Sequence, residues 1–447
     1  MQKLNAIILA GLCIVAGCDL SSAPPIPAII EGDSMAPTVC GDHLAASCVE
    51  CQFDFKTELV QKENFQLTCP NCGYGGLKIE DASLQRSTEV TLQPFARFPR
   101  RWQVVGFKLP EKADKETGLK RIVGLPGETI TIRDGDLYSG GNILRKPWAL
   151  QKEVRISVFD SKFNAISPFD NSHRFQTPDE SSGWKVGGKD LRFSSKVEAV
   201  DWLEYVHWRN FRKPGKRDEA FPVEDSYGFN QQTVRELNTT RDLMLSLDVE
   251  FENDSAIQIS FVRQDDEFIF DIAKTEKELL LSFSGSTDSE LRKPLVYKSR
   301  LEAELPRASI EFSSFDRTLM LRINGTAMFE LREQSAGLPE AGVDLNDVPN
   351  PAADQSDPDA EQPLAFRIGG RKGFFKVERF RLWRDLYYLT APAGFETAEE
   401  LKLTAGREEY ILLGDNSPKS LDSRIWEKPG ISRSSLIGRL VLPLDSP

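Results

Sequence analysis

The sequence lacks three features that would fix its class at once. It has no run of basic residues, and its net charge of −12 argues against nucleic acid as the main partner, because phosphate binding needs clustered Lys and Arg. It has no apolar stretch of the roughly 20 residues that a comfortable transmembrane helix needs. It has only three histidines, His43, His173 and His207, and none lies in a recognisable Ser-His-Asp context.

The composition is that of a soluble globular body rather than a multi-pass membrane protein, with 40% hydrophobic and 28% charged residues. The 447 residues exceed one ordinary core, so we expect two or three domains. Part of the acidity is concentrated between Glu340 and Glu361, which hold seven Asp or Glu and no Lys or Arg. We predict that residues 333–363 form a disordered acidic loop, because they bury too little apolar surface to offset the entropy of ordering.

The N-terminal segment predicts export. Lys3 precedes the apolar run AIILAGLCIVAG at residues 6–17, which has the length of a signal-peptide core. The following VAGC is similar to a bacterial lipobox, which implies lipidation of Cys18 after cleavage, and Asp19 implies retention at the inner membrane. An uncleaved anchor helix is the alternative. Either reading of residues 1–18 places the body on the extracytoplasmic face of a bacterial cytoplasmic membrane, with residues 19–30 as a Pro-stiffened tether.

Short β-like runs fill most of the remaining chain. In residues 128–138 apolar and polar side chains alternate with the period of a half-buried strand, and Asp134-Gly135 is a hairpin signal. Residues 150–385 contain many such runs, including 245–252, and the hairpin signal Asn324-Gly325, which together favour a β-sandwich. The end of this segment resembles the last strands of concanavalin- and laminin-G-like jelly rolls. Strand-like runs resume at residues 386–447, so we expect the sandwich to be inserted into a domain formed by residues 31–148 and 386–447.

Three distant segments carry the chemistry: EGDSMAPTV at residues 31–39, LKRIVGLPGETI at 119–130 and LLGDNSPKSLDSRIW at 412–426. Ser34 needs a base to become a nucleophile. A lysine serves if its pKa of about 10.4 falls by roughly three units, which burial can achieve because it disfavours the ammonium. Lys120 is the candidate in the second segment.

The three segments, in their order, resemble signal peptidase I. The nucleophile pattern Ser-Met-x-Pro-Thr is matched at residues 34–38, the Lys-Arg-x-x-Gly-x-Pro-Gly pattern at 120–127, and the Gly-Asp-Asn…Ser-x-Asp-Ser-Arg pattern by residues between Gly414 and Arg424. The resemblance covers about 180 residues in two pieces and leaves the sandwich unaccounted for.

The resemblance implies a role for each matched residue. Ser34 is the nucleophile and its backbone N–H is part of the oxyanion hole, Lys120 is the general base and acid, and Ser420 orients the Lys120 amine. Asp422 and Arg424 form a structural ion pair. Gly32 stands where some relatives carry an additional hydroxyl donor, so that donor is absent here. The family uses no catalytic cofactor.

Four cysteines form two close pairs, Cys48-x2-Cys51 and Cys69-x2-Cys72. Their spacing is typical of a four-cysteine zinc ribbon, which we place at residues 47–76. Disulfides are the alternative, because an oxidising compartment favours them. Four thiolates leave no open position, so a bound zinc would be structural.

Together these observations predict a mainly β protein: a signal-peptidase-type catalytic β-domain with an inserted four-cysteine zinc ribbon and a large inserted jelly-roll β-sandwich. The expected function is cleavage of signal peptides from exported preproteins after small residues, with membrane lipid as a further partner. The alternative is an extracytoplasmic binding or scaffold protein with a vestigial peptidase domain. The sequence assigns no ligand to the sandwich, and the complete set Ser34, Lys120 and Ser420 favours the enzyme.

Overall fold

The computed structural model describes residues 24–441 except 31, 63, 88, 109–116, 178, 209–216, 253, 264–265, 287–294, 303–305 and 333–365. Cys18, the expected signal segment and the whole of the expected acidic loop therefore lie outside the described residues. The protein is mainly β, as the sequence predicts, and its described part contains one α-helix, α1 (Trp148–Val154). Among the described residues no helix is long and apolar enough to cross a bilayer.

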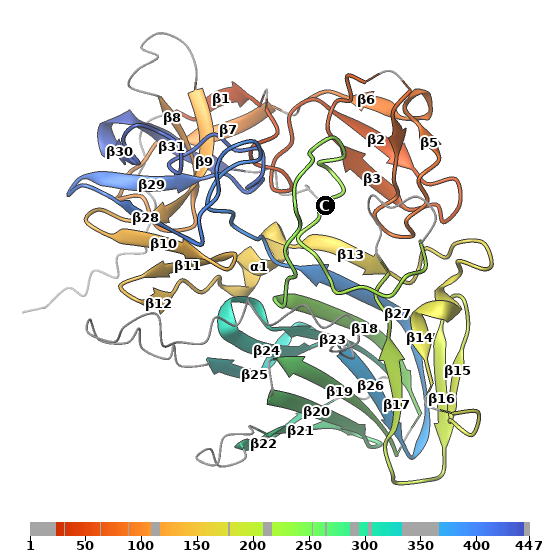
Figure 1. Ribbon diagram of the computed structural model, residues 1–447. Coiled ribbons are helices and arrows are strands. Elements are labelled where there is room, and N and C mark those ends of the chain that lie inside the picture. The colour runs from red at the N-terminus through yellow and green to blue at the C-terminus, as the bar shows by residue number, and fades with distance from the viewer. Residues whose placement is uncertain are drawn as a thin grey trace, which may run out of the picture.

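Two sheets join the two ends of the chain into one unit, which we call the body (Figure 1). The order of the seven-stranded sheet is β1 (Ile26–Ile29), β7 (Glu89–Gln93), β31 (Leu436–Val441), β8 (Val104–Lys108), β9 (Thr117–Gly124), β29 (Glu409–Leu413) and β30 (Gly430–Ser432). The order of the four-stranded sheet is β12 (Asn142–Ile143), β11 (Asp136–Ser139), β10 (Thr129–Arg133) and β28 (Glu400–Thr404). Strands from before residue 144 thus pair with strands from after residue 399.

Two features of the body bear on the sequence analysis. Asp134 and Gly135 have φ of 51° and 84° and turn the chain between β10 and β11, as their hairpin signal indicates. The expectation of a tether over residues 19–30 is wrong for residues 26–29. They form β1 and pair with β7, because Ala28 and the neighbouring Ile30 pack onto the apolar cluster that contains Met35.

The sandwich consists of two sheets that share one apolar core. The order of the first is β15 (Trp184–Val186), β16 (Leu191–Ser195), β27 (Gly373–Arg384), β18 (Leu243–Phe251), β23 (Arg307–Ser313), β24 (Thr318–Ile323) and β25 (Thr326–Arg332), with β13 (Ile156–Asp160) also on β27. The order of the second is β14 (Phe175–Gln176), β17 (Asp201–Tyr205), β26 (Phe366–Arg371), β19 (Ser255–Arg263), β20 (Asp266–Lys274), β21 (Glu278–Ser286) and β22 (Leu295–Glu302).

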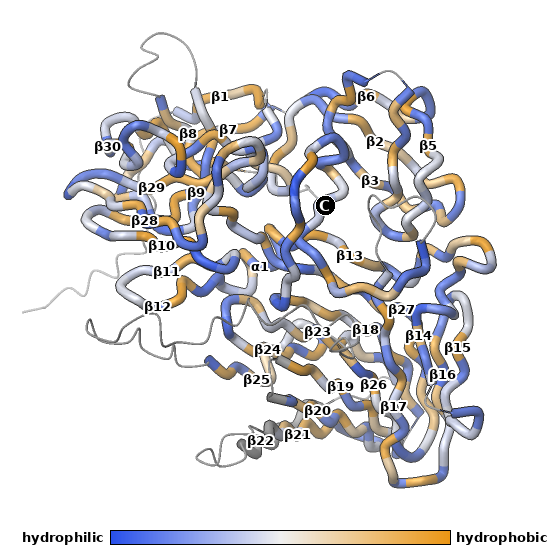
Figure 2. The backbone as a smooth tube through the Cα atoms, viewed as in Figure 1, coloured by the Kyte–Doolittle hydropathy of each residue, from blue (hydrophilic) through white to orange (hydrophobic). Residues whose placement is uncertain are grey.

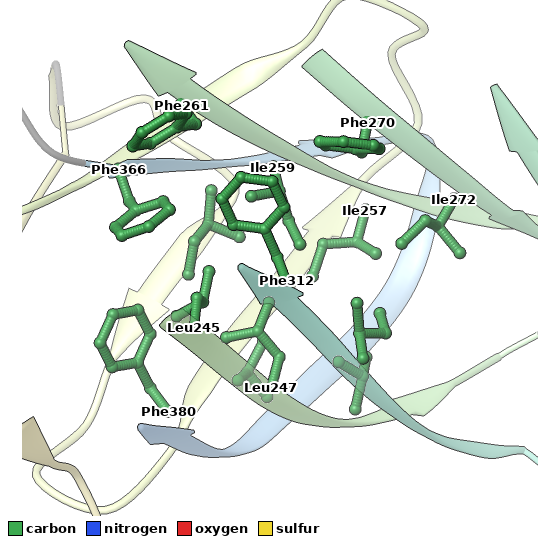
Figure 3. Packing of buried hydrophobic residues seen from close by; sticks show 14 of the residues in the cluster. Leu245, Leu247, Ile257, Ile259, Phe261, Phe270, Ile272, Phe312, Phe366 and Phe380 are labelled. Carbon is green, nitrogen blue, oxygen red and sulfur yellow. The ribbon is translucent and has the colours of Figure 1, made fainter. Parts of the chain in front are cut away.

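Alternation along the strands builds the sandwich core. On β18, Leu245 and Leu247 are fully buried while Asp248 is partly exposed, and Figure 2 shows hydrophobic and hydrophilic positions alternating along these strands. Side chains of both sheets meet between them, among them Phe312 from the first sheet and Phe270 from the second (Figure 3). Each such aromatic or aliphatic side chain contributes roughly 1.5–3 kcal/mol on burial. The shared apolar core therefore holds the two sheets of the sandwich together.

A small third unit, which we call the ribbon, spans residues 43–85. Its strands are β2 (His43–Ser47), β3 (Asp54–Thr57), β4 (Gln66–Leu67), β5 (Leu77–Lys78) and β6 (Ser83–Gln85). The unit is larger than the expected range 47–76, because β2 pairs with both β3 and β6. Its core consists of the four cysteines and a few apolar side chains, with Phe163 and Ala165 of the sandwich insertion packed against them.

Candidate active site

The Ser34 hydroxyl and the Lys120 amine are in direct contact although 86 residues separate them. Ser34 lies in the turn after β1, and the next residue, Met35, is buried in the apolar cluster of the body. Lys120 lies within β9. The Lys120 Nζ atom donates a hydrogen bond to Ser34 Oγ at 2.6 Å and is 3.1 Å from the Leu119 carbonyl oxygen. This is the geometry that a base needs to accept a hydroxyl proton.

Burial makes the Lys120 amine a usable base. Only 6% of the residue is exposed, and desolvation lowers its pKa to about 8. The carboxylates of Asp422 and Asp415 act in the opposite direction and raise the pKa, while the guanidinium of Arg424 lowers it further. At pH 7 about a tenth of the molecules therefore carries the neutral amine, a far larger share than an ordinary exposed lysine provides.

Ser420 lies beside the nucleophile but does not touch the base. Its side chain is fully buried, and its Oγ atom has no hydrogen-bond partner among the described residues. A Cβ atom on Gly414 would lie 2.2 Å from Ser420 Oγ and 2.4 Å from the Ser34 carbonyl oxygen, so the segment needs glycine there. The hydrogen bond that the family resemblance implies between Ser420 and the Lys120 amine is thus not present in this structure.

Asp422 and Arg424 form a buried bidentate ion pair with two contacts of 2.8 Å. Asp422 also accepts from the Gly414 N–H at 3.0 Å. Arg424 donates to the backbone carbonyls of Leu389, Ser417 and Ser420. The pair therefore fixes the backbone from 414 to 424 around Ser420. Gly32, by contrast, is exposed, and no atom lies within 4 Å of where its Cβ would be.

A second buried ion pair was not singled out from the sequence. Arg121, next to Lys120, makes two hydrogen bonds of 2.8 and 2.7 Å to the carboxylate of Asp415. Asp415 also accepts from the Thr38 hydroxyl at 2.5 Å, which joins the nucleophile turn to the strand that carries the base. Arg121 and Asp415 both lie inside the motifs that resemble signal peptidase I. These motifs are therefore the sequence feature that could have pointed to this ion pair.

The three histidines are not part of this contact. His43 Nδ1 is 2.8 Å from the Gly41 carbonyl oxygen, and His207 contacts the Tyr205 hydroxyl in the sandwich. Burial and the nearby Arg174 guanidinium lower the pKa of His207 to about 3, which keeps the imidazole neutral.

The four ribbon cysteines converge on one point. Their sulfur atoms all lie within 4.8 Å of one another, with Cys48–Cys72 at 3.7 Å and Cys51–Cys69 at 3.6 Å. Disulfides would need about 2.05 Å, whereas ligands at about 2.3 Å around a tetrahedral zinc are about 3.8 Å apart. In each pair a tight turn follows the first cysteine, with Gln52 N–H donating to Cys48 and Gly73 N–H to Cys69. The donor set fits a four-coordinate zinc.

The comparisons with known proteins agree with the site over part of the chain. Residues 3–181, less than half of the chain, match the family described as signal peptidase, peptidase S26. This match includes Ser34 and Lys120 and supports a peptide-bond hydrolase at the level of the family. No curated protein matches the chain.

Solved structures that are similar to this chain cover from 32% to 59% of it. They include the Bacillus subtilis carbohydrate-binding module CBM66, with 6% identity and a TM-score of 0.23, covering 48% of this chain and 95% of its own. The Bacillus licheniformis β-glucanase has 7% identity and a TM-score of 0.28, with 50% and 96% covered. The Caenorhabditis elegans galectin LEC-6 has 14% identity and a TM-score of 0.20, with 32% and 81% covered.

Proposed function

We propose that this chain is a serine endopeptidase that removes signal peptides from exported preproteins, cutting after small residues at the first and third positions before the scissile bond. The observation that carries the proposal is the 2.6 Å contact between the Ser34 hydroxyl and the buried amine of Lys120. The family match over residues 3–181 supports it independently.

The reaction follows from this contact. The neutral Lys120 amine accepts the proton of Ser34 as Oγ attacks the substrate carbonyl carbon, and the Ser34 backbone N–H stabilises the oxyanion. The resulting ammonium gives its proton to the leaving amine as the C–N bond breaks and an acyl-enzyme remains. Water then attacks the ester with Lys120 again as base, and Ser34 recovers its proton.

An open strand edge is available for the substrate. Residues 117–119 of β9 pair with β8 on one side, and no described strand pairs with them on the other, because β29 begins its pairing at Arg121. An extended peptide that adds to this edge reaches the position next to Lys120. In this proposal backbone pairing supplies affinity, and shallow pockets that admit only small side chains would supply specificity.

A cleavage assay on a preprotein with Ala at both specificity positions tests the proposal. Ser34→Ala and Lys120→Met should each lower kcat/KM by about three orders of magnitude or more, and the double variant should be little worse than either, because the two groups act as a unit. The Met side chain keeps the apolar stem, so the fold should survive. Near-normal cleavage by Lys120→Met would show that another base acts, with His43 the first to examine.

We further propose that the ribbon holds one structural zinc ion bound by Cys48, Cys51, Cys69 and Cys72. The four thiols exceed disulfide distance and match the edges of a tetrahedral site. Purified protein should carry about one zinc per chain by elemental analysis, and Cys69→Ser should unfold the ribbon. Two intact disulfides without metal in a mass spectrum would sink the idea.

The proposed location is the extracytoplasmic face of the bacterial inner membrane, with a lipid on Cys18. The sequence VAGC followed by Asp19 supports it. Mass spectrometry of the membrane-bound protein should find a lipidated Cys18 at the mature N-terminus. If Cys18→Ala protein stays membrane-bound and uncleaved, the apolar segment at residues 6–17 anchors it instead.

A further inference from the structure

A segment of the sandwich insertion contacts the nucleophile loop. After β17 the chain leaves the sandwich, and residues 227–232, which we call the strut, lie between the ribbon and the body (Figure 1). In the strut Asn230 is 7% exposed. Its side-chain amide pairs with that of Asn416 through two reciprocal hydrogen bonds of 2.6 and 2.9 Å. The sandwich insertion therefore reaches the segment that carries Ser420.

Asn416 transmits this contact to the nucleophile. Its side-chain amide also donates to the Asp33 carbonyl oxygen at 3.0 Å, and its backbone N–H donates to the Ser34 carbonyl oxygen at 3.0 Å. The two hydrogens of its Nδ2 are thus shared between Asp33 and Asn230, and its Oδ1 accepts from Asn230. With this pairing the Asn416 side-chain amide has one orientation, and in that orientation it holds the carbonyl of Asp33, while the Asn416 backbone N–H holds the carbonyl of Ser34.

The strut is itself held from the ribbon side. The Gln231 side chain bonds to both backbone groups of Thr68 at 3.0 and 2.9 Å, and the Gln232 N–H donates to Glu58 at 2.6 Å. Glu58 is buried and also contacts the amine of Lys419, the neighbour of Ser420. Asn230 therefore projects from a braced segment rather than from a free loop.

We propose that Asn230 is a positioning residue that holds the Ser34 nucleophile in line with Lys120 through Asn416. The proposal rests on the endopeptidase function proposed above and adds a residue from outside the recognised motifs. A displacement of about 1 Å at a reacting atom lowers a rate by as much as about 100-fold. Loss of the amide pair frees the Asn416 side chain to rotate, so the 2.6 Å contact between Ser34 and Lys120 would no longer be maintained.

Asn230→Ala in the full chain tests this, with Asn238→Ala as the matched control. Asn238 follows the strut in the chain and bonds to Asp225 instead of the nucleophile loop. Asn230→Ala should lower kcat by about 10- to 100-fold, with KM and the midpoint of the pH profile unchanged. Asn238→Ala should keep kcat. In an Asn416→Ala background, Asn230→Ala should have less than about a twofold further effect, because the two residues act in series.

Hydrogen exchange gives a second measurement that does not depend on activity. The backbone N–H of Asn416, which donates to the Ser34 carbonyl, should exchange faster in Asn230→Ala than in the wild type. Its exchange rate should be unchanged in Asn238→Ala. A wild-type kcat in Asn230→Ala, or an equal loss in both variants, overturns the inference. If the wild-type protein shows no cleavage that depends on Ser34, the proposed function fails. The exchange rates then decide alone whether Asn230 holds the loop.

Discussion

Two buried lysines in this protein have pKa values that are shifted in opposite directions. Lys120 is 6% exposed and Lys146 is 4% exposed, so desolvation acts on both. It lowers the pKa of Lys120 to about 8. It would lower the pKa of Lys146 too, but the carboxylates of Asp316 and Asp385 raise that pKa well above the usual range. Their oxygens lie 2.5 and 2.8 Å from Lys146 Nζ.

The difference shows what keeps Lys120 available as a base. Its amine contacts a hydroxyl and a backbone carbonyl, while the nearest acidic groups are occupied elsewhere: Asp422 pairs with Arg424, and Asp415 pairs with Arg121. The two carboxylates whose charges act on Lys120 are thus each paired with a guanidinium. At Lys146, by contrast, the ammonium itself is the counterion of Asp316 and Asp385. Burial alone therefore does not make a catalytic lysine, and the partners of the surrounding acids decide its charge.

Exchanging each lysine for methionine should separate the two roles most sharply. Lys120→Met should abolish cleavage while leaving thermal stability unchanged or raised, because a buried amine is removed. Lys146→Met should lower the free energy of unfolding by about 3–5 kcal/mol, because it leaves buried carboxylates without a cation. Its remaining folded fraction should cleave normally. Thermal denaturation together with active-site titration measures both, and a stable Lys146→Met protein would contradict the comparison.

Removal of the Ser420 hydroxyl should lower activity without lowering stability. Because it is buried without a described partner, Ser420→Ala should not lower stability, since an unsatisfied buried hydroxyl already opposes folding. If the hydroxyl engages Lys120 during the reaction, activity should fall by about 10- to 1000-fold.

Ser423→Ala is the matched control for Ser420. The Ser423 hydroxyl accepts from the Leu412 N–H at 2.9 Å and donates to the Pro429 carbonyl at 2.6 Å. Its removal should destabilise the protein by about 1–3 kcal/mol and spare the chemistry. If both variants lose stability and keep activity, Ser420 has only a structural role.

The pH profile of kcat/KM should report the Lys120 amine. Its rate should rise about tenfold per pH unit on the acid side and level off above a midpoint near 8, because only the neutral amine accepts the Ser34 proton. Initial rates from about pH 5.5 to about pH 10 with a saturable peptide substrate measure this. A midpoint near the usual histidine value of about 6.5 would point to His43 rather than Lys120.

The sequence predicted those parts of this protein that local patterns encode. Alternation placed β18 of the sandwich, Asp134-Gly135 placed the turn before β11, and Asn324-Gly325 placed the turn between β24 and β25. The cysteine spacing indicated one cluster, and the motifs named the two side chains that meet at the candidate site.

The contacts that the sequence did not predict join residues that no local pattern relates. Arg121 and Asp415 are 294 residues apart, and Asn230 and Asn416 are 186 apart. Asn230 lies outside every recognised motif, in a segment expected to be part of the sandwich. A polar pair of this kind follows only from how the units pack. The absence of a Ser420–Lys120 contact likewise depends on side-chain placement rather than on the motif.

The smallest expected effect concerns the acidic groups around Lys146. Carboxylate oxygens of Asp136, Asp242 and Asp316 lie within 4.8 Å of one another, with Asp385 also on Lys146, at the junction of the body and the sandwich. Burial, followed by repulsion from Asp242 and Asp316, raises the pKa of Asp136 well above 3.8, although Lys146 opposes the change. Burial likewise raises the pKa of Asp385 to about 8.

The sign of the pH dependence follows from these directions. A carboxyl whose pKa is raised on folding binds its proton more tightly in the folded state, so its stabilising contribution is complete below about pH 4 and is lost as the pH rises toward 8. Asp136→Asn removes one of these charges. It should therefore raise stability at pH 8 and leave stability at pH 4 nearly unchanged.

Asp134→Asn is the control for this variant, because Asp134 lies two residues away with its side chain 85% exposed, and its φ of 51° suits asparagine. It should change stability at neither pH. Thermal denaturation of the three proteins at pH 4, 6 and 8 makes the measurement. If Asp136→Asn destabilises the protein at pH 8, the ionised carboxylate of Asp136 stabilises the junction, and the raised pKa of Asp136 is wrong in direction.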